Sequence, residues 1–83
     1  MRIKSLGANK TEVRTNKIRL LISYETPVCY IDYMADPPIA YKSDTFHSIT
    51  TSKHINQWLL DYGFDSKATS TIPQAFLNAI LET

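Results

Sequence analysis

Apolar and polar residues alternate along the N-terminal half of the chain, which is the period of a β-strand with one buried face. The alternation is clearest over residues 17–24, where one face carries Ile18, Leu20, Ile22 and Tyr24. Leu21 interrupts the opposite, polar face, so we expect a helix to cover it. A weaker alternation over 11–15 predicts a preceding strand, with a hairpin tip at residues 15–17.

A third strand is predicted over 28–33, and its apolar residues on both faces are typical of a central strand. Pro27 cannot donate a hydrogen bond to a sheet, so we place it at the first position of this strand or in the turn before it. The two prolines at 37 and 38 exclude helix and central strand there. Segments 39–42 and 45–49 predict a final strand, so that strands occupy about residues 2–49.

The last third of the chain changes to helical spacing. A helix is predicted over about 52–62, because its apolar stripe consists of Ile55, Trp58, Leu59 and Tyr62. Its N-cap candidates are Thr50, Thr51 and Ser52, and Gly63 stands where a C-terminal cap belongs. Thr71 and Gln74 have the spacing of a capping box, which predicts a second helix over about 72–82.

These elements predict an α+β fold of two layers, in which a small antiparallel sheet of three to five strands is followed by two C-terminal helices. The 83 residues fit a single compact domain over 1–83. The chain has two glycines, which excludes a glycine-rich phosphate loop, and one cysteine, which excludes an internal disulfide. A core of this size gives a stability of only about 3–5 kcal/mol, so self-association is an option to retain.

Positive charge is concentrated at the N-terminal end. Up to residue 19, six basic residues and one acid give +5, whereas the rest of the chain carries −4 and the whole chain +1. Basic side chains that guard an exposed sheet edge are the favoured explanation, because the run is diffuse. The alternative is a module that binds single-stranded nucleic acid by pairing cations with strand aromatics. It would use Arg14, Lys17, Arg19, Tyr30 and Tyr41.

The densest polar segment, 45–54, contains His47, His54 and several hydroxyl residues around the predicted helix start. Helix capping explains these hydroxyl groups without a ligand. A hydrolytic triad or a metal site would need the histidines to converge with a carboxylate or with Cys29, and the spacing does not enforce this. We therefore expect no enzymatic activity, no metal and no other cofactor. The residues expected to contact a protein partner are Thr50, Thr51, Lys53, His54, Asn56 and Gln57.

Three segments, 24–28, 41–44 and 50–59, resemble small proteins of unknown function that tailed bacteriophages encode. In those proteins a TPVA strand precedes a helix start similar to TTSKHINKWL. Cys29 stands here where that pattern has alanine, and Gln57 where lysine is common. The resemblance covers about residues 11–60. It implies expression inside a bacterial host and an accessory role, and it assigns no catalytic residue.

The first residues lack the apolar segment of a signal peptide, and apolar runs such as Leu20–Ile22 are far too short to cross a membrane. We therefore expect the protein to act in the cytoplasm of a bacterial host cell, without membrane contact. The predicted function is that of a small phage-type accessory protein that binds a host or phage macromolecule, for example as an inhibitor of a bacterial defence system. A protein partner is expected, and nucleic acid is the alternative.

Overall fold

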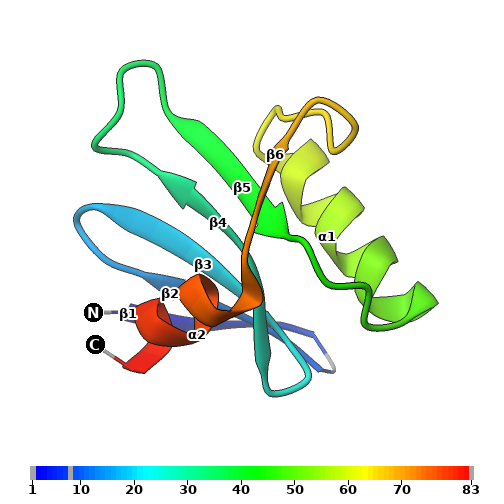
Figure 1. Ribbon diagram of the computed structural model, residues 1–83. Coiled ribbons are helices and arrows are strands. Elements are labelled where there is room, and N and C mark those ends of the chain that lie inside the picture. The colour runs from blue at the N-terminus through cyan, green and yellow to red at the C-terminus, as the bar shows by residue number, and fades with distance from the viewer. Residues whose placement is uncertain (1, 8, 83) are drawn as a thin grey trace.

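The computed structural model describes residues 2–7 and 9–82, which form a six-stranded sheet and two helices (Figure 1). The elements in chain order are β1 Arg2–Gly7, β2 Lys10–Arg14, β3 Ile18–Ser23, β4 Thr26–Asp32, β5 Ile39–Ser43, α1 Ile49–Asp61, β6 Ser70–Ile72 and α2 Gln74–Glu82. The strands lie in the sheet in this same order. β1 to β5 form an antiparallel meander, and β6 pairs parallel to β5 after the chain has crossed over through α1.

The two helices pack on opposite faces of the sheet, so the fold has three layers (Figure 1). Leu21 and Ile31 face α1, whereas Leu20 and Tyr30 pack with Leu77 of α2. The predicted two-layer arrangement is therefore wrong, because it would leave one apolar face of the central strands in water. The α+β class, the central position of β4 and the helix over Leu21 are confirmed.

The sheet has six strands instead of the predicted three to five. β6 has three residues, too few to display an alternation, and it follows α1 in the chain. The predicted strand over 45–49 does not form, because residues 44–48 are irregular and Ile49 is already helical. Strands therefore do not fill the range 2–49, and one of them lies between the helices.

The turns of the meander differ from the expectation in detail. The hairpin tip at 15–17 is confirmed, and the Thr15 hydroxyl accepts hydrogen bonds from the backbone N–H groups of Lys17 and Ile18, both at 3.1 Å. Tyr24 is not on the apolar face of β3: it lies in the next turn at φ 58° and is half exposed. Pro27 is the second residue of β4 and lies at a register irregularity, where a missing donor is tolerated.

α1 begins before the predicted start because Ser48, in extended conformation, is its N-cap. The Ser48 hydroxyl accepts a hydrogen bond from the Thr51 backbone N–H at 3.0 Å. The expected end at Gly63 is confirmed. Gly63 adopts φ 84°, its N–H donates to the Leu60 carbonyl, and the Phe64 N–H donates to the Leu59 carbonyl, which is the Schellman pattern.

α2 does not begin with the predicted capping box, because Thr71 belongs to β6 and the helix begins at Gln74. The Gln74 side chain instead joins two distant segments. Its amide donates to the Pro27 carbonyl at 2.7 Å, and its Oε1 accepts from the hydroxyl of Ser43 at 2.5 Å. The first residue of α2 is thereby fixed to β4 and β5.

Candidate functional site

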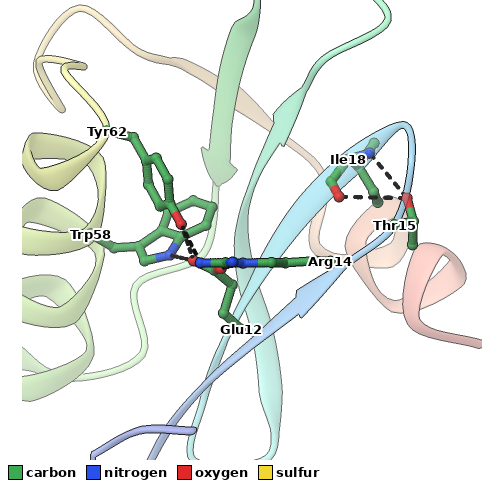
Figure 2. Close-up of polar contacts among 6 residues, drawn as sticks. All are labelled: Glu12, Arg14, Thr15, Ile18, Trp58 and Tyr62. Carbon is green, nitrogen blue, oxygen red and sulfur yellow. Dashed lines mark hydrogen bonds and ion pairs between the residues drawn. The ribbon is translucent and has the colours of Figure 1, made fainter. Parts of the chain in front are cut away.

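A buried carboxylate connects β2 to α1 (Figure 2). The Glu12 side chain is 1% exposed, and its Oε1 accepts hydrogen bonds from the Trp58 indole N–H at 2.8 Å and from the Tyr62 hydroxyl at 2.6 Å. The guanidinium of Arg14 forms an ion pair with Oε2 of the same carboxylate. Glu12 therefore faces α1, and its charge is fully engaged by these three partners.

The surroundings of Glu12 keep it ionised. Burial alone would raise the pKa of its carboxyl group, but the hydrogen bonds from Tyr62, Arg14 and Trp58 together outweigh burial and lower the pKa. The pKa of the Tyr62 hydroxyl is correspondingly raised, by burial first and then by its bond to Glu12. Tyr62 therefore remains a hydrogen-bond donor to the carboxylate.

Because Glu12 faces α1, the pleat of the sheet fixes which other side chains share that face. Cross-strand partners point the same way, and the register pairs Arg2 with Arg14 and Arg14 with Arg19. These three arginines form a row across β1, β2 and β3, at a spacing of about 4.8 Å per strand. We call this set the arginine row.

Two lysines extend the positive surface around the arginine row. Lys4 is the cross-strand partner of Glu12, and Lys10 alternates with Glu12 along β2, so both lie on the α1 face. Within β1 to β3, Glu12 is the sole acid, and it is buried. We define the basic face by Arg2, Lys4, Lys10, Arg14 and Arg19.

Aromatic rings hold the inner end of the arginine row. The Arg19 guanidinium lies 5.0 Å from the ring centroid of Tyr33 and 4.9 Å from that of Tyr62. These are cation–π distances, and they orient Arg19 without neutralising its charge. Arg14 is 28% exposed beside it, and Arg2 is exposed at the outer edge of the sheet.

The structure divides the residues predicted for nucleic-acid binding between different surfaces. Arg14 and Arg19 are adjacent on the α1 face, and Lys17 is exposed in the hairpin loop. Tyr30 and Tyr41 are stacked on each other at 5.0 Å between ring centroids, on the α2 face. As residues of this site, sequence reasoning missed Arg2, Lys4, Lys10 and Tyr33. The strand alternation together with the register places the three cations, and only the contact with Arg19 places Tyr33.

The residues predicted to contact a protein partner also separate into two groups. Thr50, Lys53, Asn56 and Gln57 lie on the exposed side of α1. Thr51 and His54 instead contact the buried Ser23, whose hydroxyl oxygen lies 3.0 Å from Thr51 Oγ1 and 2.9 Å from His54 Nδ1. These two side chains anchor α1 to β3, and burial, followed by the charge of Lys10, lowers the pKa of His54.

The remaining residues considered for catalysis or metal binding, His47 and Cys29, have structural roles. His47 lies in the segment before α1, and its Nε2 is 2.9 Å from Oε1 of Gln74, the first residue of α2. Cys29 is buried, and burial raises the pKa of its thiol to about 12, so it is a neutral core residue at physiological pH. Across residues 2–7 and 9–82, no three His, Cys, Asp or Glu side chains gather into a group that could hold a metal ion.

The fold and the basic face define a small α+β protein with a positively charged sheet surface beside a helix. A family model, described as a family of unknown function (DUF8033), matches residues 1–78, so the chain belongs to this family. Neither a curated protein nor a solved structure matches the chain significantly. In the part of the chain that the structure describes, neither helix has the length and apolar character needed to cross a membrane.

Proposed function

We propose that this protein binds an anionic macromolecule through its basic face. The observation that carries the proposal is the arginine row, in which cross-strand register sets three arginines opposite one another on the same face of the sheet. Like charges directly opposite each other destabilise a sheet. Binding to a partner with regularly spaced negative charges turns this repulsion into attraction, which supports a binding role for the row.

The rest of the basic face supports the same function. The one acid of these strands, Glu12, is buried and ion-paired with Arg14, so β1 to β3 hold no acid that could offset the other four cations of the basic face. Although the net charge of the whole chain is only +1, its positive charge is therefore concentrated on one part of the surface. The favoured sequence-based explanation, edge protection, accounts for Arg2 and Lys4 on the edge strand β1 but not for Arg14 and Arg19 on inner strands.

The proposal predicts that removing charge from β1 weakens polyanion binding more than removing equal charge elsewhere. The variant Arg2→Gln/Lys4→Gln should elute from immobilised heparin at clearly lower salt than the wild type, because counterion release scales with the number of contacts. The matched control is Lys53→Gln/Lys67→Gln, which removes two charges from exposed positions outside the basic face. Equal shifts for the two variants, or no retention of the wild type, would refute the proposal.

A second candidate function is that of a phage-type accessory protein that binds a host protein, such as a component of a bacterial defence system. It is supported by three large apolar side chains that are 66–73% exposed, namely Phe46, Ile49 and Leu60. Ile49 and Leu60 lie on α1, and Phe46 lies in the segment before it. Exposed apolar side chains around polar ones are typical of protein interfaces. This surface also includes Thr50, Lys53, Asn56 and Gln57.

The two candidate functions make different predictions for one capture experiment. If the α1 surface binds a host protein, the tagged wild type should retain a stoichiometric partner from a nuclease-treated lysate of phage-infected bacteria. Ile49→Lys/Leu60→Lys should lose that partner, because two charges then enter an apolar contact, whereas Arg2→Gln/Lys4→Gln should keep it. A partner that both double variants retain would not depend on this surface.

A further inference from the structure

We propose that the partner of the basic face is a single strand of nucleic acid, with phosphates along the arginine row and one base stacked on Tyr33. This inference rests on the proposed function and specifies its ligand. It uses three observations: where α1 stands, how Arg19 is held, and how far Tyr33 is exposed.

The position of α1 determines the shape of the ligand that can reach the arginine row. On this face α1 covers residues of β3, β4 and β5, and Leu6 of β1 packs against the same cluster, whereas Arg2 and Lys4 of β1 are exposed. Figure 1 shows α1 lying along one face of the sheet. The row therefore begins in the open at Arg2 and ends beside α1 at Arg19, under the ring of Tyr62. The row thus runs along the boundary between the part of the sheet that α1 covers and the exposed cations of β1.

This position of the arginine row beside α1 suits a single strand better than a duplex. Proteins that read duplex DNA insert a protruding helix or β-ribbon into a groove. Here the cations lie on the sheet beside α1 and do not protrude from the protein. The row is only about 10 Å long over its two strand spacings. A flexible single strand can follow such a surface, with its bases splayed away from the phosphates.

The guanidinium groups of the row have the geometry that phosphate recognition needs. Arginine presents its N–H donors as a planar fork that matches a phosphate. The Nε of Arg14 is committed to Glu12 and its Nη2 donates to the Tyr62 hydroxyl at 3.4 Å, which fixes the direction of its side chain and leaves its remaining N–H donors for a ligand (Figure 2). Arg19 is held over the rings of Tyr33 and Tyr62, which fixes the position of its guanidinium beside Arg14.

Tyr33 distinguishes nucleic acid from an acidic protein as the partner. Tyr33 is 38% exposed, and its ring adjoins the row at Arg19. An acidic peptide needs only the cations, whereas a nucleic-acid base also needs an aromatic surface beside them. The stacked pair of Arg19 and Tyr33 provides a cation and an aromatic ring at one place. This pairing favours nucleic acid as the partner, and the test below compares its binding with that of an acidic polymer.

The test measures binding of a fluorescein-labelled oligothymidylate of roughly 16 nucleotides by fluorescence anisotropy, because that length covers typical site sizes. The wild type should bind with a slope of log K against log salt of about −2, from three phosphates at roughly −0.7 each. Tyr33→Leu keeps an apolar side chain under Arg19 and should weaken binding roughly tenfold through lost base stacking. Tyr33→Phe should restore the affinity, because its ring remains.

A control and a spectroscopic readout separate stacking from general destabilisation. Phe76→Ala removes an aromatic ring of similar exposure, 49%, from the α2 face and should leave the affinity unchanged. An oligonucleotide that carries 2-aminopurine should show a fluorescence change on binding to the wild type and to Tyr33→Phe, and a smaller change with Tyr33→Leu. This signal reports a base against a ring and does not respond to stability alone.

The outcomes distinguish the ligand from the function. Equal binding of heparin, polyglutamate and oligothymidylate, with no effect of Tyr33→Leu, would overturn the single-strand inference and leave a general anion-binding face. Tighter binding of a duplex of the same length would overturn it as well. Absence of binding to every one of these polyanions at low salt would overturn the proposed function itself.

Discussion

Replacing Glu12 with alanine is expected to remove most of the stability of the fold. The substitution leaves the buried indole N–H of Trp58 and the hydroxyl of Tyr62 without their acceptor. Losing the acceptor of buried donors and the charge between them costs about 2–4 kcal/mol. A protein of this size has only about 3–5 kcal/mol to lose. The melting temperature should therefore fall by roughly 10 °C or more, measured by the near-UV circular dichroism of Trp58.

A comparison with Glu12→Gln isolates the contribution of the charge. Glutamine retains an acceptor oxygen for Trp58 and Tyr62, so it should be less destabilising than alanine. The lowered pKa of Glu12 also gives the wild type a specific pH dependence. The stabilisation from the ionised carboxylate is complete above the ordinary carboxyl pKa of about 4.3 and is lost as the pH falls through the lowered value. Glu12→Gln should lack that acid-dependent loss, and an identical acid transition in both proteins would contradict the role assigned to Glu12.

Leu77→Ala is expected to release α2 from the sheet. Leu77 is fully buried and packs with Val13, Leu20 and Tyr30, so it is the core residue that this nine-residue helix contributes. Truncating a buried leucine costs about 2–5 kcal/mol, because the contacts are lost and a cavity remains. The urea midpoint should fall accordingly, with the amides of α2 exchanging fastest.

Leu81→Ala in the same helix is the matched control. Leu81 is 42% exposed, so the same chemical change should cost less than about 1 kcal/mol. Equal losses at the two positions would mean that helix propensity, and not the contact of Leu77 with the sheet, determines how α2 is held. Hydrogen exchange of β4 in the same samples would show whether the sheet persists once α2 is released.

Local patterns predicted those parts of the fold that local physics determines. The shared face of Ile18, Leu20 and Ile22 in β3, the apolar character of β4 and the cap at Gly63 depend on neighbouring residues, and each is confirmed. β6 and the placement of α2 depend on contacts across the chain. The hydrogen bond from the Gln74 amide to the Pro27 carbonyl is such a contact, and no spacing in the sequence predicts it.

The candidate site also depends on contacts between distant parts of the chain, which sequence patterns do not predict. All five cations of the basic face are visible in the sequence, yet they appear diffuse because they belong to three strands. Only the register, which pairs Arg2 with Arg14 and Arg14 with Arg19, turns them into a row. The exposure of a tyrosine is equally long-range. Tyr30 was a candidate from its strand position, but α2 covers it, whereas Tyr33 follows the end of β4 at Asp32 and remains accessible.

The crossover through α1 has a consequence for how the chain assembles during synthesis. The strands β1 to β5 are joined by short connections, so the meander can form by local closure as soon as Ser43 has left the ribosome. β6 and α2 follow α1 in the chain, so Leu20 and Tyr30 have no cover on their face until α2 has been synthesised. A nascent chain that lacks α2 would therefore expose an apolar sheet face, and surfaces of this kind are prone to aggregation.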